Sequence, residues 1–145
     1  MKLQVATASA LLVALGSCAA QGERPAPAAG GGASVAVLAR SSVTVTGQPL
    51  RSPEPPWEAV ISRSELPAGG ALPRHRHPWP RFVYIESGRI RVSYETSGLI
   101  REFGSGEAII EALDEWHEAV VIGPQPVRLI VFDQVPPGQT NVALR

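Results

Sequence analysis

The chain has 145 residues, with 13 basic and 13 acidic side chains, three histidines and one cysteine. This length suits a single domain with its own hydrophobic core. The balanced charge argues against a basic nucleic-acid-binding protein and against an acidic disordered tail, so we expect no nucleic-acid partner. One cysteine excludes an intramolecular disulfide and a cysteine-rich zinc site. Any metal chemistry must therefore rest mainly on the histidines.

Residues 1–17 are predicted to be a signal peptide. One lysine precedes an apolar run over residues 3–15, which is too short to cross roughly 30 Å of bilayer hydrocarbon as a permanent helix. The motif LGSC at residues 15–18 resembles a bacterial lipoprotein box, a family in which the leader is cleaved and the cysteine lipidated. This resemblance implies an exported protein of the periplasm or cell envelope, bound to the membrane only through a lipid on Cys18. In the alternative, cleavage after a following alanine leaves a soluble periplasmic protein.

Residues 18–34 are predicted to be a flexible tether. Residues 19–34 contain no large apolar side chain and many alanines, glycines and prolines. Such a stretch cannot bury enough surface to offset the entropy lost on ordering. The folded domain is therefore predicted to cover residues 35–145.

The folded part is predicted to be all-β. Short runs rich in valine, isoleucine, phenylalanine and tyrosine alternate with turn residues, and no window shows convincing helical periodicity. Strands spaced about 8–12 residues apart favour a sandwich or barrel. The predicted strands are Val35–Ala39, Val43–Thr46, Trp57–Glu65, Phe82–Glu86, Arg89–Glu95, Leu99–Phe103, Glu107–Glu111, His117–Ile122 and Val127–Asp133.

Two histidines, His75 and His77, stand at i and i+2. In an extended segment both side chains point to one face, ~6.6 Å apart along the chain. A third imidazole on a neighbouring strand could complete a facial set of nitrogen donors around one divalent ion, and His117, which opens a later predicted strand, is the remaining candidate. Without further context, surface histidines would be the better interpretation of this pair.

The spacing around the pair resembles the first motif of the cupin family, G-x5-H-x-H-x3-E-x6-G. The matching positions are Gly69, His75, His77, Arg81 and Gly88, with arginine in place of the glutamate. The resemblance implies a cupin-type β-barrel, or jelly roll, over most of residues 57–133, with a metal site inside its mouth.

The second cupin motif is degenerate in this chain. The spacing from Gly106 to His117 is kept, but where cupins usually carry P-x-G-x-x-H-x3-N, this chain has Ala112, Asp114, His117 and Val121. All three histidines nevertheless fall on the family's histidine positions. The resemblance therefore implies His75, His77 and His117 as metal ligands.

Arg81 stands where the family has its glutamate ligand, and a guanidinium has no lone pair for a metal. The resemblance is then to all-histidine cupins such as cysteine dioxygenase and acetylacetone dioxygenase. It implies one divalent transition metal, iron in the first place, with zinc, manganese, nickel or copper as alternatives.

The charge of Arg81 also predicts a ligand. Three neutral imidazoles, a divalent ion and an inward-pointing guanidinium would attract a small carboxylate or another anion. In the alternative, Arg81 swings outward or forms a structural ion pair with Glu111 or Glu115. Trp79 beside the motif is predicted to contact the substrate, although a role in the core is the more usual one for an aromatic residue.

Two classes of function remain open. The first is a metal-dependent enzyme, in its most specific form a mononuclear non-haem iron oxygenase acting on a small, anionic organic molecule. The second is a non-catalytic envelope module that binds a small ligand or a metal ion; a barrel that has lost its metal is a third possibility. Many cupins are dimers, and an apolar strand at Val35–Ala39 could pair across subunits, so a homodimer is expected.

Overall fold

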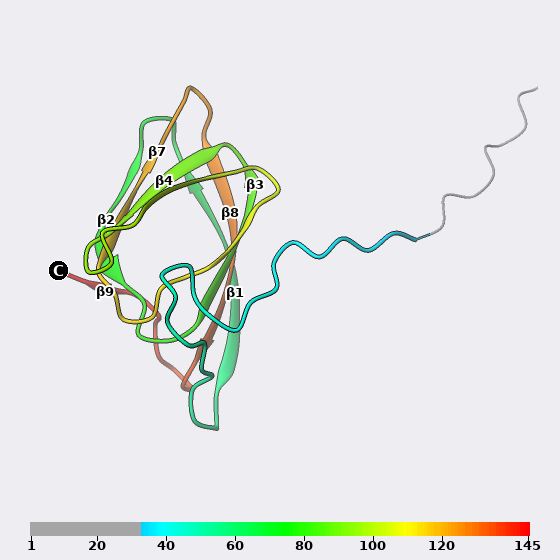
Figure 1. Ribbon diagram of the computed structural model, residues 1–145, viewed down its shortest axis with the longest axis vertical. Helices are drawn as coiled ribbons and strands as arrows, with labels where there is room; N and C mark the ends of the chain where they lie inside the picture. The colour runs from blue at the N-terminus through cyan, green and yellow to red at the C-terminus, as the bar shows by residue number, and fades with distance from the viewer. Residues whose placement is uncertain (1–32) are drawn as a thin grey trace, which may run out of the picture. The chain divides into compact units, whose positions relative to one another are not determined.

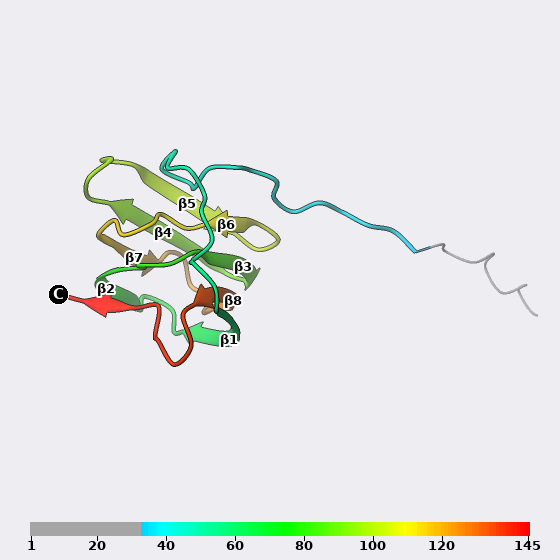
Figure 2. The same ribbon diagram turned by 90° about the horizontal axis from the view of Figure 1, so that it is seen from below.

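The computed structural model describes residues 33–145, and residues Val35–Arg145 group into one compact unit. The described residues form nine β-strands and no α-helix (Figures 1 and 2). The strands are β1 (Glu58–Leu66), β2 (Ala71–Arg76), β3 (Arg81–Ser87), β4 (Arg89–Tyr94), β5 (Ile100–Gly104), β6 (Ala108–Ile110), β7 (His117–Val121), β8 (Val127–Val135) and β9 (Ala143–Leu144). No helix long and apolar enough to cross a membrane occurs in this part of the chain. The predicted signal peptide, Cys18 and most of the predicted tether lie outside the described residues.

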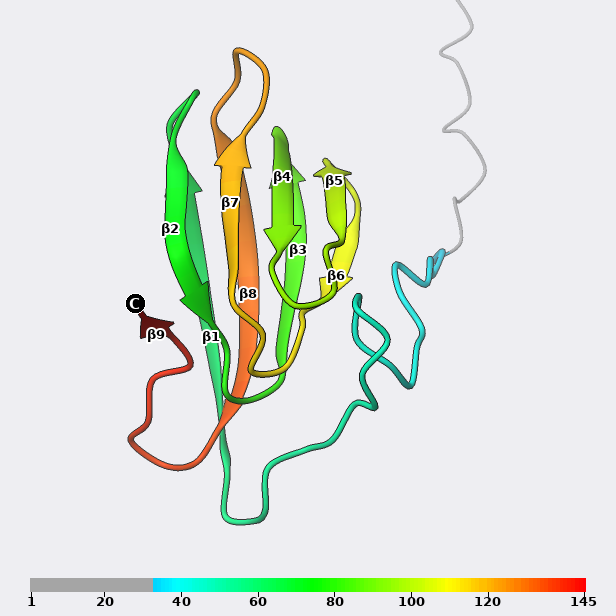
Figure 3. The same cartoon turned by 60° about the vertical axis from the view of Figure 1, so that its left-hand side comes forward.

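The strands form two antiparallel sheets that face each other (Figures 1 and 3). One sheet has the order β1-β8-β3-β6 and the other the order β5-β4-β7-β2-β9. The chain crosses between the two sheets at nearly every connection, so strands adjacent in sequence rarely pair with each other. This arrangement is a jelly roll, and the predicted all-β fold is confirmed.

The core lies between the sheets because β3, β4, β7 and β8 alternate between buried and more exposed residues. Along β8, Val127, Leu129 and Val131 are buried, whereas the residues between them are exposed or half-buried. Successive side chains of a strand point to opposite faces, so this period of two places one face of β8 in the core. On the facing sheet, Ile90 and Val92 of β4 pack into the same buried cluster.

All the strands predicted from Trp57 onward are present, with ends that differ by one or two residues. Two earlier predictions are wrong: residues 35–39 have no regular secondary structure, and residues 43–46 make only a single bridge, from Val43 to Pro49. Conversely, β2 and β9 were not predicted as strands. In β2 a proline and alternating arginines and histidines hide the pattern, and its pairing with β7 is irregular between Leu72 and His75.

Candidate metal centre

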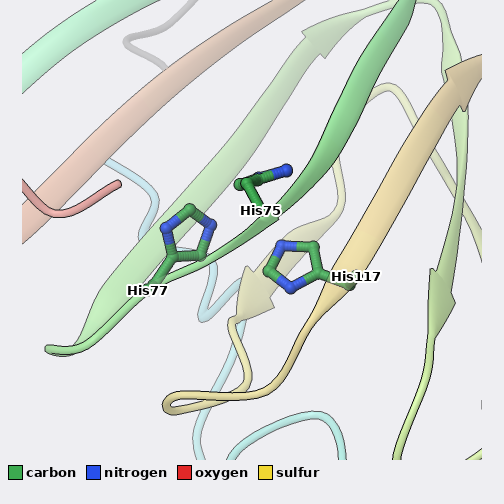
Figure 4. A group of neighbouring side chains, drawn as sticks. All are labelled: His75, His77 and His117. Atoms are coloured by element: carbon green, nitrogen blue, oxygen red, sulfur yellow. The ribbon is translucent and has the colours of Figure 1, made fainter. Parts of the chain in front are cut away.

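Two neighbouring strands bring the three histidines together. His75 lies near the end of β2, His77 follows that strand directly, and His117 is the first residue of β7. Since β2 and β7 are antiparallel neighbours in which His75 and His117 are register partners, their rings meet at one end of the sheet. All three side chains are buried between the sheets and point toward one another (Figure 4).

Backbone carbonyls fix the orientation of each imidazole. The Nδ1 atoms of His75, His77 and His117 lie 2.7, 2.7 and 2.9 Å from the carbonyl oxygens of Pro73, Asn141 and Glu115. A carbonyl oxygen can only accept a hydrogen bond, so each Nδ1 carries the proton. Each Nε2 therefore keeps a free lone pair, which is the state in which a histidine binds a metal.

The donor set fits one divalent transition metal. The nitrogen ligand atoms of the three residues all lie within 4.8 Å of one another, and their ring centroids are 4.3–4.9 Å apart. Three imidazoles with hydrogen-bonded Nδ1 atoms suit iron, zinc, copper or nickel, and leave coordination positions for other ligands. No carboxylate belongs to this cluster among the described residues.

Burial keeps two of these imidazoles neutral. Desolvation lowers the pKa of His77 to about 2, and the nearby positive charge of Arg81 adds to the effect. Desolvation likewise lowers the pKa of His75 to about 4. At neutral pH both rings are therefore available as lone-pair donors, without competition from protons.

A strained turn places His117 beside the other two histidines. Asp114, three residues before His117, has a φ of 51°, and it is the only non-glycine residue with positive φ among the described residues. It stands at the glycine position of the second cupin motif. Its N–H donates to the carbonyl oxygen of His77 at 2.8 Å, and its carboxylate pairs with Arg76 at 3.0 Å. Aspartate tolerates the left-handed conformation better than most residues, so the turn survives the loss of glycine.

The histidines lie at one side of a cavity of about 260 Å³ between the sheets. Its polar lining consists of the three histidines, Ser64, Arg81 and Glu111. Most of the remaining lining is apolar: Leu72, Val83, Ile85, Ile90, Val92, Ile109, Leu129 and Val131. The cavity therefore combines a small polar side with a largely hydrophobic wall.

Arg81 points inward, but its charge is already compensated. The guanidinium forms a bidentate pair with Asp133 of β8, with Nε–Oδ1 and Nη2–Oδ2 distances of 2.7 and 2.8 Å. The alternative ion pair of Arg81 with Glu111 or Glu115 is therefore wrong. Glu111 instead accepts a hydrogen bond from the hydroxyl of Tyr94, and Glu115 from the N–H of Ser97.

The tryptophans lie outside the lining of this cavity. Trp79 is half-buried, and its backbone N–H and carbonyl bond to the side chain of Asn141. Trp116 packs against the guanidinium groups of Arg74 and Arg76, at 4.8 and 4.9 Å from the ring centroid. The cavity geometry thus lends no support to a substrate contact by Trp79.

Four residues near the site had no predicted role there, or the wrong one: Tyr94, Glu111, Asp133 and Asn141. Asp133 has the clearest signal in the sequence, because it has the same parity as Val127, Leu129 and Val131 on an alternating strand. A carboxylate on the apolar face of a strand must find a buried partner.

Residues 62–133 match the family described as the cupin domain. The match includes both histidine motifs, and the jelly roll described above is the fold that the resemblance implied. The chain belongs to the cupin family. Among curated protein sequences, none matches this chain.

Several solved structures are similar to this chain. The polyketide cyclase RemF from Streptomyces resistomycificus is 30% identical over 60% of this chain and 62% of its own, with a TM-score of 0.49. The DMSP lyase DddQ from Ruegeria pomeroyi is 22% identical, with coverage of 59% and 42% and a TM-score of 0.50. A protein of Bacillus halodurans is 20% identical, with coverage of 60% and 69% and a TM-score of 0.50. The present chain thus spans about three fifths of the cyclase and less than half of the lyase.

Proposed function

We propose that this cupin binds one divalent transition metal through His75, His77 and His117 and uses it on a small organic molecule in the adjoining cavity. The observation that carries this proposal is the convergence of three buried imidazoles whose Nδ1 protons are all held by backbone carbonyls. An arrangement that merely filled the core would not need three imidazole nitrogens within 4.8 Å of one another.

The most specific form of the proposal is a mononuclear non-haem iron oxygenase. Iron held by three nitrogens would supply redox chemistry and open positions for a substrate and for dioxygen. The chain's own part is to hold the imidazoles neutral and oriented. The apolar lining of the cavity then limits the access of water to the bound molecule.

The metal proposal is tested by elemental analysis of the purified chain, prepared without a polyhistidine tag. We expect close to one transition-metal ion per chain, and iron would favour oxygen chemistry whereas zinc would favour hydrolysis or binding. A His75→Ala variant should lose the metal, whereas Arg74→Ala, a change of the preceding residue, should keep it. A wild-type chain that stays empty after reconstitution with iron or zinc would overturn the proposal.

An anionic substrate remains a prediction of the sequence. Its support is that Arg81 lines the cavity. Against it, Asp133 already neutralises the Arg81 guanidinium through two hydrogen bonds. The guanidinium therefore adds little net positive charge to attract an anion.

A non-catalytic binding module is the second candidate. The buried carboxylate of Glu111 is the only acidic group lining the cavity among the described residues, and no general acid or base has been assigned. Measuring dioxygen consumption distinguishes the oxygenase from the binding module. A metal-loaded protein that binds a ligand but consumes no dioxygen with it would favour the module.

Export and lipid anchoring at Cys18 complete the proposal from sequence. Their support is the apolar leader followed by LGSC at residues 15–18. When cells are fractionated, we expect the wild-type chain in the membrane fraction. A Cys18→Ala variant should appear in a different fraction or keep its uncleaved leader. Identical fractionation and processing of both chains would remove the lipoprotein assignment.

We also propose a homodimer. Its support is an apolar row across the outer surface of the four-stranded sheet, formed by Ile61, Phe132, Phe82 and Ile110, which are register partners on β1, β8, β3 and β6. We call these four residues the outer row. Val35, Val37 and Leu38 are also exposed and find no cover among the residues that the structure describes. Apolar surface of this kind is typical of a contact with another protein.

A further inference from the structure

Glu111 is a buried carboxylate that faces the cavity. It follows β6 directly, is 6% exposed and belongs to the polar lining. Its Oε2 accepts a hydrogen bond from the hydroxyl of Tyr94 at 2.8 Å. Its second oxygen, Oε1, has no hydrogen bond to any of the described residues, and it is not one of the fully enclosed atoms left without a partner. That oxygen is therefore open to whatever occupies the cavity.

Tyr94 holds this carboxylate in place. The tyrosine lies on β4 of one sheet and Glu111 beside β6 of the other, so their hydrogen bond crosses the interior. The hydroxyl donates to Oε2, so this hydrogen bond uses one oxygen of Glu111 as an acceptor and fixes the orientation of the carboxylate.

The other charged groups at the cavity are satisfied by one another. Arg81 occupies both oxygens of Asp133, and Asn141 donates a further hydrogen bond to Oδ1 at 2.7 Å. Arg81 is the only lysine or arginine in the lining among the described residues. In the metal-free chain, a ligand with its own negative charge would therefore meet a compensated guanidinium and an open carboxylate.

We propose that the cavity takes a neutral, mainly apolar molecule that carries a hydroxyl group, and that this hydroxyl donates to the free oxygen of Glu111. The hydrophobic wall accommodates the body of the ligand, because burying apolar surface is favourable and burying a charge there is not. Glu111 contacts the ligand, and Tyr94 is a positioning residue that acts through Glu111. The inference rests on the proposed function for the ligand's place beside a metal, but the contact to Glu111 does not depend on the metal.

The test compares three probes of the same shape: p-cresol, its methyl ether and p-toluate. The full chain is titrated with each probe in calorimetry, once loaded with zinc and once metal-free, with the metal content measured on the same samples. We expect p-cresol to bind about tenfold more tightly than its methyl ether, because a hydrogen bond to a charged acceptor is among the stronger ones. In the metal-free preparation p-toluate should bind more weakly than p-cresol, because no uncompensated cation among the described residues lines the cavity there. In the zinc-loaded preparation the ion itself can bind a carboxylate, so p-toluate is compared with p-cresol only in the metal-free chain.

Variants assign the preference to Glu111. Glu111→Gln should reduce the affinity for p-cresol about tenfold, to that of the methyl ether, without changing the metal content. Glu118→Gln, at an exposed position of β7, should behave as the wild type. Tyr94→Phe should reduce the discrimination between p-cresol and its ether while leaving the affinity for the ether unchanged. A purely structural role for Tyr94 would instead weaken all three probes equally.

Three outcomes would overturn the inference: equal binding of p-cresol and its ether, a preference for p-cresol that survives in Glu111→Gln, or tightest binding of p-toluate by the metal-free chain. If Glu111→Gln does not fold, Glu111→Asp, which withdraws the carboxylate by one methylene, must lose the same preference. A chain that binds no metal yet discriminates between the probes would refute the proposed function and leave this inference standing.

Discussion

At the scale of single residues, the feature that distinguishes this site is the ion pair between Arg81 and Asp133. Its side chain is 16% exposed and that of Asp133 is 7% exposed, so this is an ion pair withdrawn from water. Its two parallel hydrogen bonds fix the planar guanidinium against the carboxylate. The position that supplies a glutamate in the usual cupin motif thus supplies a salt bridge in this chain.

Removing the arginine should destabilise the fold. Arg81→Met leaves Asp133 as a buried carboxylate with only Asn141 as a partner, and breaking such a pair costs about 3 kcal/mol. The double variant Arg81→Met, Asp133→Asn removes both charges and should recover most of that loss. Urea denaturation of the wild type and the two variants measures the free energies of unfolding. Equal stability of all three proteins would show that the pair contributes nothing to the fold.

The buried histidines make stability depend on pH. An unfolded chain protonates His75 and His77 below about pH 6.5, whereas the folded chain holds their pKa values at about 4 and about 2. Between these limits the unfolded state binds more protons, so the folded state loses stability as the pH falls. We expect the metal-free protein to lose about 2–3 kcal/mol from pH 6.5 to pH 5.

Denaturation at a series of pH values, with a chelator present, measures this loss. The variant His75→Gln, His77→Gln lacks both titrating groups, so its free energy of unfolding should change much less over the same range. A wild-type curve as flat as that of the variant would mean that the imidazoles are solvated in the native state.

The residue scale also shows what the sequence can predict. The placement of the three histidines followed from their spacing, because a cupin motif fixes which strands carry them. The partner of Arg81 did not, because Asp133 lies 52 residues further along the chain and joins it only through the pairing of β3 with β8. The role of Glu111 was equally hidden, since its contact with Tyr94 crosses from one sheet to the other.

At the scale of elements, the turn between β3 and β4 depends on Gly88. Its φ is +82°, and a Cβ there would collide with the carbonyl oxygen of Pro126 and with Val127. The turn therefore requires glycine at this position for two reasons: the positive φ, and the lack of space for a Cβ. Because Gly88 is also the last glycine of the first cupin motif, the motif is partly a packing requirement.

A matched pair of substitutions separates these two requirements. Gly88→Ala should cost about 2–4 kcal/mol, because it combines the strained φ with a clash against backbone. Gly98→Ala has a similar φ of +66° but no atom within 4 Å of the added Cβ, so it should cost only about 1 kcal/mol. Thermal or urea unfolding compares the two. Equal losses would mean that the contact with Pro126 relaxes at no cost.

Elements with apolar alternation were predicted well, and elements defined by their neighbours were not. β8 has buried residues at every second position, and such a pattern identifies a strand by itself. β9 has only two residues, Ala143 and Leu144, and is a strand only because β2 lies beside it. The segment 35–39 is the converse case, because its apolar residues have no adjacent strand among residues 33–145.

At the scale of the whole molecule, the outer row and residues Val35, Val37 and Leu38 leave apolar surface open to solvent. In the outer row, Phe82 and Phe132 lie with ring centroids 5.7 Å apart, and Ile61 on the edge strand is 70% exposed. Residues 39–41 line one groove of the surface together with three members of the outer row, Phe82, Phe132 and Ile110. A two-fold dimer presents the same surface twice, so one such face can cover its copy.

Light scattering during size-exclusion chromatography tests the dimer. The wild-type chain is expected at twice the mass of one chain. Ile61→Lys places a charge in the outer row, where desolvating it is costly, and should shift the protein to a monomer. Ile100→Lys is the matched control, because Ile100 is 65% exposed but lies on β5 of the other sheet. Both substitutions leave the core intact, so a wild-type monomer, or a dimer broken only by Ile100→Lys, would refute a contact through the outer row.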